Sequence, residues 1–264
     1  MILEWISRRI AAFLTKRVGT QSVTTTEFEA LRGSLTPGDV LLIDGDTRIS
    51  SIIKYLTQST WSHSALYLGP DAGLPTGEDG EPHVLIEADL EDGIRSLPLS
   101  FYRDDHSRVC HPVGLDQSEI DSIAEYSKKR IGHQYDMKNV VDLARYLVPL
   151  PVPGRYRRRM LAFGSGDPTR AICSSFIAEA FQNIRYPILP VIKTLPSDDP
   201  RCVRCEKELF SIRHHSLFTP KDFDSSPYFQ IVKPSLTENF DFRKIDWEKH
   251  ERKNRESIIH SRDR

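Results

Sequence analysis

A cysteine, a histidine and a glutamate in this chain of 264 residues have the types and positions that nucleophilic catalysis needs. Cys173 opens the segment CSSFIAEAF, whose apolar spacing predicts a helix that begins at the cysteine. His63 lies in WSHSALYLG and Glu87 in HVLIEAD, which are both predicted strands. A thiol at a helix N-terminus meets unpaired N–H groups and the positive end of the helix dipole, and both favour the thiolate. We therefore predict that Cys173 is a nucleophile, that His63 is its base and that Glu87 orients the imidazole.

This unit predicts attack of a thiolate on an amide or ester carbonyl, through a tetrahedral oxyanion to an acyl-enzyme. The backbone N–H of Cys173 is expected to donate to the oxyanion, while His63 takes the thiol proton and returns it to the leaving group. A hairpin can bring His63 and Glu87 to one sheet face, and we expect the cysteine helix to pack across that face. Trp61 shares the strand face of His63, and the small Ser174 lets a substrate approach the cysteine, so both are predicted substrate contacts.

The elements that must position these residues are strands in the first half of the chain and helices in the second. The predicted strands lie at 40–43, 61–69, 83–89, 93–99 and 108–113, and the predicted helices lie at 28–31, 47–57, 116–132, 136–147 and 173–184. The helix at 116–132 has a capping box, Asp116 with Glu119, at its start and Gly132 at its end. This order predicts an α+β fold with an antiparallel sheet or barrel rather than alternating βαβ units.

We predict three segments along the chain. Residues 1–34 form an amphipathic N-terminal helix and a linker, residues 35–232 form the catalytic domain with a basic, proline-rich insertion at 149–170, and residues 233–264 form a charged tail. Arg8 and Arg9 interrupt the apolar stretch at the N-terminus, so we do not interpret it as a signal peptide. The helix either docks onto its own domain or lies on a membrane surface.

Composition excludes several classes of protein. A formal net charge of -1 argues against a dedicated nucleic-acid binder, and four cysteines in a chain of this length are not a disulfide framework. No apolar run reaches the roughly 18–20 residues that span a bilayer, so we expect a cytoplasmic location, free or peripheral to a membrane. The basic run from Arg155 to Arg159 is either a solvated loop or a contact with an anionic surface such as a membrane.

The remaining cysteines give weaker signals. Cys202 and Cys205, with His214 and His215 further on, have some zinc-ligand character, but a single C-x-x-C pair is poor evidence of a metal site. We therefore predict neither a metal nor a cofactor. Cys110 lies inside a predicted strand and is expected to belong to the core.

The order WSHSALYLG, then an IEA strand, then a late CSSFIAEAF helix resembles the permuted papain-like hydrolases, the YiiX/YaeF-like branch of the NlpC superfamily. In ordinary papain-like enzymes the cysteine helix precedes the histidine strand, whereas in the permuted branch it follows, as it does here. The resemblance runs from about residue 35 to 190 and includes LTPGDVLLI and GHQYD. It implies that His63, Glu87 and Cys173 occupy the catalytic positions of the family, and that Tyr135 falls where a tyrosine often lines the site.

The function that this resemblance implies is that of a cysteine peptidase, amidase or acyl hydrolase acting on peptide-like or lipid-linked carbonyls. Two alternatives remain open. An acyltransferase forms the same thioester and passes the acyl group to an amine or alcohol instead of water. A non-catalytic membrane-associated binding module keeps the fold without turnover.

Overall fold

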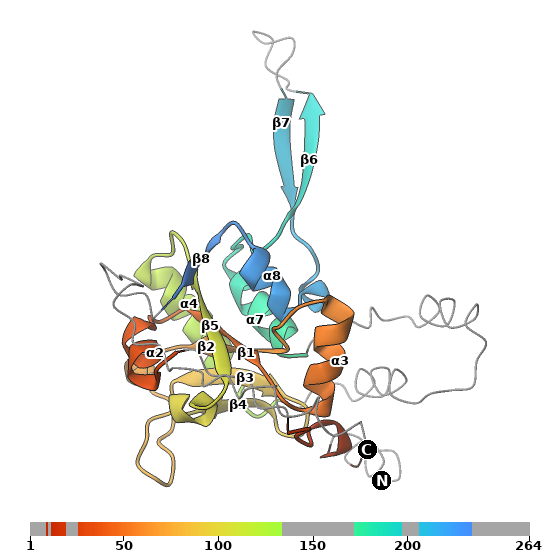
Figure 1. Cartoon of the computed structure of the whole chain (residues 1–264). Helices are drawn as coiled ribbons and strands as arrows, with labels where there is room; N and C mark the ends of the chain where they lie inside the picture. Colours follow the sequence, from red (N-terminus) through yellow and green to blue (C-terminus); the bar gives the residue numbers. More distant parts are fainter. Residues whose placement is uncertain (1–8, 10–11, 20–25, 134–171, 197–205, 234–264) are drawn as a thin grey trace, which may run out of the picture.

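The structure, a computed structural model, describes residues 9, 12–19, 26–133, 172–196 and 206–233 (Figure 1). Its centre is a six-stranded sheet in the order β4-β3-β2-β1-β5-β8, and every neighbouring pair is antiparallel. The strands are β1 (Val40–Asp44), β2 (His63–Tyr67), β3 (Leu85–Asp89), β4 (Gly93–Leu97), β5 (His106–Pro112) and β8 (Phe229–Val232). The predicted α+β class with an antiparallel sheet is confirmed. The sheet is open, with β4 and β8 at its edges.

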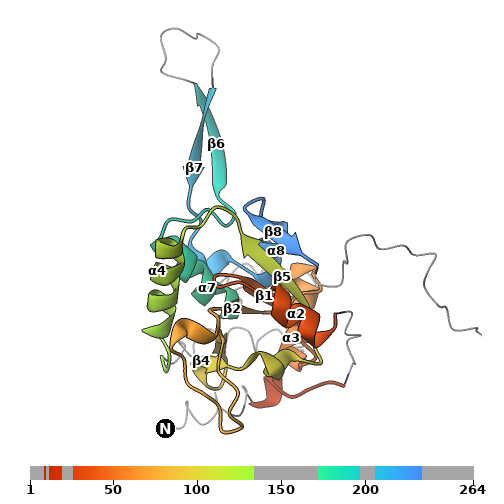
Figure 2. The same ribbon diagram turned by 90° about the vertical axis from the view of Figure 1, so that its left-hand side faces the viewer.

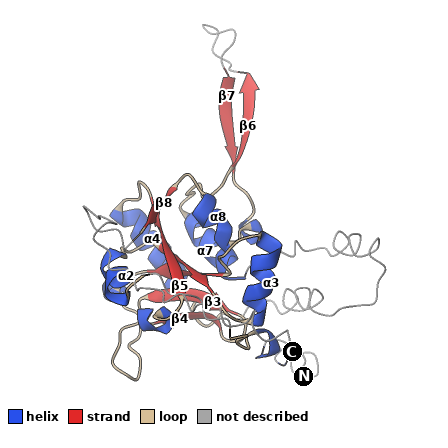
Figure 3. Cartoon of the chain, in the orientation of Figure 1, coloured by secondary structure: helices blue, strands red, loops and turns tan. Residues whose placement is uncertain are grey.

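Helices cover both faces of this sheet (Figure 3). On one face lie α4 (Gln117–Lys128), α7 (Ile172–Asn183) and α8 (Pro220–Ser225), and the other face carries α2 (Phe28–Ser34) and the 3-10 turn η2 (Leu99–Tyr102). The helix α3 (Arg48–Thr57) connects β1 to β2, and two further 3-10 turns are η1 (Pro70–Ala72) and η3 (His215–Leu217). The sheet is thus the middle layer of the domain.

The central strand shows why the sequence folds into these layers. In β1, Val40 and Leu42 point into the cluster beneath α7, while Leu41 and Ile43 point into the cluster beneath α2. Successive side chains of a strand point to opposite faces, so a strand covered on both sides is a continuous apolar run. The sequence VLLI is such a run, and all four side chains are buried.

The predicted elements of residues 26–133 are present, with small shifts at their ends. The capping box of α4 forms as expected, since Asp116 accepts from the Glu119 N–H at 2.9 Å and Glu119 accepts from the Asp116 N–H at 3.0 Å. The helix ends at Lys128, four residues before Gly132. Gly132 adopts a positive φ of 85° and donates its N–H to the carbonyl of Ile94, which draws the chain to the sheet edge. The predicted helix 136–147 and the insertion 149–170 lie outside the described residues.

Part of the N-terminal segment packs on the domain. Leu14 is fully buried in the cluster beneath α7, and Val18 donates its N–H to the Asp46 carbonyl at 2.8 Å. Arg17 forms an isolated antiparallel bridge with Thr47, at the start of α3. Residues 12–18 therefore lie against the domain, whereas residues 1–8 lie outside the described chain, and the membrane alternative remains a prediction for them.

A two-stranded hairpin, β6 (Val191–Pro196) with β7 (Glu206–Ser211), was not predicted and projects from the domain (Figures 1 and 2). Its exposed large apolar side chains include Val191, Ile192 and Phe210. Among the helices that the structure describes, none combines the length and the apolar character needed to cross a bilayer.

Candidate active site

The start of α7 meets the sheet next to β2 and β3. Helix α7 contacts both strands, and its first-turn residue Ser174 lies 3.2 Å from Ser64 of β2, hydroxyl to hydroxyl. The apolar residues around this contact, such as Leu66 and Ile86, belong to the cluster beneath α7. The prediction that α7 packs across the face of His63 and Glu87 was wrong. Ala65 and Leu85, which share the strand parity of His63 and Glu87, lie in the cluster on the opposite face.

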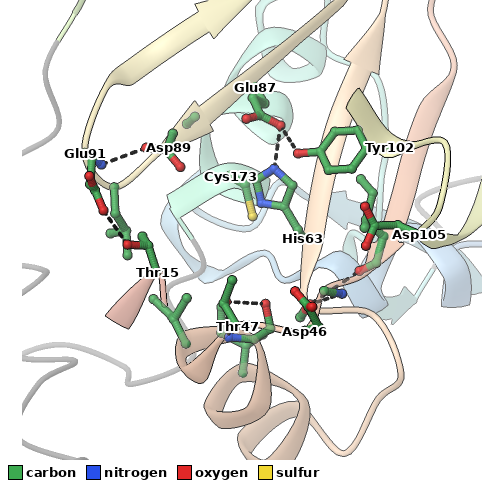
Figure 4. Close-up of a pocket in the computed structure, with 18 of the residues that line it drawn as sticks. Thr15, Asp46, Thr47, His63, Glu87, Asp89, Glu91, Tyr102, Asp105 and Cys173 are labelled. Carbon is green, nitrogen blue, oxygen red and sulfur yellow. Dashed lines mark hydrogen bonds and ion pairs between the residues drawn. The ribbon is translucent and has the colours of Figure 1, made fainter. Parts of the chain in front are cut away.

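Cys173 nevertheless reaches His63, because β2 and β3 are not paired along the part of β2 that carries His63. The ladder of β2 with β3 consists of Leu66–Ile86 and Tyr67–Leu85, whereas His63 pairs with Ile43 of β1. The end of β2 that carries His63 is thus not joined to β3, and the N-terminus of α7 lies there. Figure 4 shows the sulfur of Cys173 beside the imidazole ring.

The three predicted catalytic residues are brought together. His63 Nε2 donates to Glu87 Oε2 at 2.8 Å, which leaves Nδ1 as the ring nitrogen for the thiol (Figure 4). A side-chain hydrogen bond joins His63 and Cys173. Cys173 is 4% exposed and Glu87 is 1% exposed, while the side chain of His63 is 21% exposed. A carboxylate therefore fixes the ring on one side, and the thiol lies on the other.

The electrostatics of the site favour an ion pair. Burial opposes ionisation of Cys173, but the charge of His63 and hydrogen bonds from His63 and Ser64 lower the pKa of the thiol. Burial would likewise lower the pKa of His63, but the charges of Cys173 and Glu87, with their hydrogen bonds, raise it well above its usual value. Both shifts favour a thiolate of Cys173 beside a protonated His63.

Two further residues, Arg95 and Tyr102, bind Glu87 and were not predicted. Arg95 donates to Glu87 Oε1 from Nε at 3.0 Å and from Nη2 at 2.8 Å, and the Tyr102 hydroxyl donates to Oε2. Burial would raise the pKa of Glu87, but the charge and hydrogen bond of His63, the charge of Arg95 and the hydrogen bond of Tyr102 lower it to about 2. The sequence carried a signal for Arg95, because EADLEDGIR is a hairpin in which Glu87 and Arg95 are equidistant from Glu91. For Tyr102, on η2, there was no such local signal.

Two predicted substrate contacts lie elsewhere. Ser174 is fully buried between α7 and β2, where it contacts Ser64, and it does not line the pocket. Trp61 is 3% exposed, and its ring stacks on His106 with centroids 5.4 Å apart and lies under the Arg108 guanidinium. Trp61 precedes β2, whose ladder begins at His63, so strand alternation does not govern its direction. Neither side chain lines the pocket that contains Cys173 and His63.

A pocket of about 340 Å³ opens above Cys173, His63 and Glu87. Its walls come from Thr47 with Ile49 and Ile53 of α3, from Thr15 and Arg17 of the N-terminal segment, and from the turn between β3 and β4. Thr15 donates to Glu91 of that turn, so residues 15–17 bridge two sides of the pocket (Figure 4). Six carboxylates and two guanidinium groups line it, and these are Asp46, Glu87, Asp89, Glu91, Asp92 and Asp105 with Arg17 and Arg95. The pocket is therefore electronegative.

The remaining predicted residues lie outside the described chain or away from the pocket. Tyr135, the run Arg155–Arg159, Cys202 and Cys205 all lie outside the described residues. His214 and His215 are described, and their rings are 4.2 Å apart. Within the described ranges, no three His, Cys, Asp or Glu side chains gather in a way that could hold a metal ion. Cys110 is buried in β5, and burial raises the pKa of its thiol.

The fold is similar to that of a solved structure. No protein-family model matches the sequence, and no curated protein matches it. The structure is similar to one described as a crystal structure of the metalloprotein YiiX from Escherichia coli O157:H7, DUF1105. The match has 16% sequence identity and a TM-score of 0.42, and it covers 75% of this chain and 96% of that chain. YiiX gives its name to the branch that the sequence motifs resemble. A likeness of this degree assigns no activity to the chain.

Proposed function

We propose that this chain is a cysteine hydrolase that cleaves amide or ester bonds through a thioester of Cys173. The observation that carries the proposal is the contact series Cys173, His63 and Glu87 at the floor of a pocket. A thiol is usually protonated near neutral pH, and the lowered pKa of Cys173 gives it the ionised form that attacks carbonyls. The motif order of the permuted papain-like hydrolases supports the same reaction.

The proposed reaction begins with the proton already on His63. The thiolate of Cys173 adds to the carbonyl carbon, and the carbonyl oxygen becomes an oxyanion. The N–H of Cys173, in the first turn of α7, has no carbonyl partner within the helix, and we expect it to donate to this oxyanion. As the tetrahedral species collapses, the bond to the leaving group breaks, and His63 gives its proton to the departing amine or alcohol.

The second half of the reaction reverses these roles. Neutral His63 accepts a proton from water, whose oxygen adds to the thioester carbon, and collapse releases the acid and the Cys173 thiolate. Glu87 keeps Nε2 of His63 protonated throughout, so the same ring nitrogen faces the thiol in both steps. An acyltransferase differs only in the acceptor that replaces water.

The electronegative lining supports a peptide-like amide with neutral or basic groups next to the scissile bond. Carboxylates around a pocket of low dielectric raise the local concentration of cations and repel anions such as phosphorylated headgroups. Binding of the basic run at 155–159 to an anionic membrane concerns residues outside the described chain. Retention of the full-length protein on anionic vesicles at low salt would support it.

The decisive experiment is capture of the acyl group on Cys173. Wild-type protein and Cys173→Ala are incubated with libraries of blocked peptides and acyl esters, and intact mass is read after rapid acid quenching. We expect an acyl adduct on the wild-type protein alone and a loss of turnover of at least about a thousandfold in Cys173→Ala. Products with and without an added amine separate hydrolysis from transfer. Equal turnover by Cys173→Ala would reject the proposal.

A further inference from the structure

The carboxylate of Glu87 is surrounded by protein donors. Its Oε2 accepts from His63 at 2.8 Å and from the Tyr102 hydroxyl, and its Oε1 accepts twice from Arg95, at 3.0 and 2.8 Å. At 1% exposure, the glutamate has almost no contact with water. A buried carboxylate stays charged only when such donors and cations replace its hydration. Arg95 supplies two of these four hydrogen bonds and one of the two cations.

Arg95 is itself fixed in place. It lies directly across the β3–β4 ladder from Glu87, and its Nη1 binds Asp92 at 2.5 Å while Nη2 lies 3.6 Å from Asp89. The side chain is 26% exposed and lines the pocket. A guanidinium held at both ends in one plane directs a carboxylate more narrowly than a flexible ammonium can. Arg95 therefore sets the direction in which Oε2 of Glu87 points.

We propose that Arg95 is a positioning residue of the active site, which keeps Glu87 ionised and directed at His63 and thereby holds the imidazolium beside Cys173. Four groups of alternating sign then follow one another, from Arg95 through Glu87 and His63 to the thiolate of Cys173. Removing the first leaves the buried Glu87 with one cation fewer, so it takes up a proton at a higher pH. His63 then loses its counter-charge, and the thiolate loses the imidazolium that stabilises it. The catalytic meaning of this role rests on the proposed hydrolase function.

The test is the pH dependence of Cys173 alkylation by iodoacetamide in the full-length protein, measured by peptide mass for wild type, Arg95→Gln and Arg95→Lys. In Arg95→Gln we expect the pH of half-maximal rate to rise by about one unit, the usual effect of losing an opposite charge. Below both midpoints, this corresponds to labelling about tenfold slower. Arg95→Lys keeps the charge and should return most of the shift. Arg108→Gln is the matched control, because Arg108 pairs with Asp224 at 2.6 Å and does not line the pocket.

A purely structural role predicts a different result. Arg95→Gln would then lower the melting temperature with an unchanged midpoint, and Arg95→Lys would resemble Arg95→Gln; that pattern overturns the proposal. If Arg95→Gln does not fold, the double variant Glu87→Gln with Arg95→Gln removes both charges of the buried pair together, which proteins tolerate better than breaking it. It should show the same midpoint as Glu87→Gln alone, and a further rise would mean that Arg95 does not act through Glu87.

These measurements are made without substrate, so they are separate from the test of the hydrolase itself. A shifted midpoint in a protein that forms no acyl adduct would reject the hydrolase proposal and keep the positioning role. An acyl adduct on wild type together with an unshifted midpoint in Arg95→Gln would support the hydrolase proposal and reject the positioning role.

Discussion

At the scale of single residues, the pKa shifts of the site favour another starting position for the catalytic proton than the sequence predicts. The sequence predicts that His63 removes the thiol proton, whereas the raised pKa of His63 and the lowered pKa of Cys173 favour a proton on the ring before any substrate binds. His63 is then first an acid and only later a base. The difference arises because Glu87 stays ionised at 1% exposure, which depends on the side chains that surround it.

This resting ion pair predicts selective labelling of Cys173 below neutral pH. An ordinary thiol at pH about 6.5 is only about 1% thiolate, so a preformed thiolate can react up to about a hundredfold faster. Cys110 is the internal control, since burial raises the pKa of its thiol. Iodoacetamide and peptide mass spectrometry should find label on Cys173 first, and His63→Ala should slow it. Equal labelling of both cysteines would contradict the ion pair.

Glu87 also predicts a pH dependence of stability. Its pKa falls from 4.5 to about 2 in the folded protein, so its contribution is present above pH 4.5 and is lost as the pH falls through about 2. We expect the unfolding free energy of wild type to exceed that of Glu87→Gln by a constant amount between about pH 4.5 and 6, below the range in which His63 titrates in the unfolded chain. This difference should shrink between pH 4.5 and 2 in denaturant titrations. Glu29→Gln, on a 68% exposed side chain, should show no such change; a difference for Glu87→Gln that stays constant would disprove the linkage.

At the scale of elements, the spacing of apolar residues predicted the individual helices and strands but not how they pack together. The 3.6-residue spacing of Phe176, Ile177, Ala180 and Phe181 predicted α7, and all four side chains are buried. Alternation predicted β2 and β3 but could not tell which sheet face α7 covers, since both faces of the sheet are apolar. The walls of the pocket were missed for a different reason. Thr15, α3 and Tyr102 come from distant parts of the chain, and no period in the sequence joins them.

Leu14 anchors the part of the N-terminal segment that contributes Thr15 and Arg17 to the pocket wall. Leu14 is fully buried, whereas the neighbouring Phe13 is 53% exposed. Leu14→Ala should lower the unfolding free energy by about 2–5 kcal/mol and raise KM for the substrate, since the wall loses its support. Phe13→Ala is the matched control and should cost at most about 1 kcal/mol, the value of its cation–π contact with Arg48. Equal effects of the two substitutions in thermal melts would show that the segment is not anchored through Leu14.

At the scale of the whole molecule, the second half of the chain was the harder half to predict. The edge strand β8 comes from the far end of the described chain and pairs with β5 through Val109–Val232 and its neighbours. A four-residue strand with mixed burial carries little periodic signal, so only its long-range partner defines it. The hairpin of β6 and β7 is likewise a pairing of two segments with each other and not with the main sheet.

That hairpin should be separable from the catalytic domain. The contacts of β6 and β7 are mainly with each other, and both views show the hairpin projecting (Figures 1 and 2). Replacing residues 193–209 with Asn-Gly keeps the pairs Val191–Ser211 and Ile192–Phe210 and closes them with a two-residue turn. We expect the melting temperature to move by no more than about 2–4 °C, the equivalent of about 1 kcal/mol, and Cys173 to alkylate at the wild-type rate. Phe223→Ala, in the nearby α8 at 0% exposure, should instead cost about 3–5 kcal/mol. If the shortened protein unfolds, or if its Cys173 is alkylated more slowly than in wild type, the hairpin is part of the core of the domain.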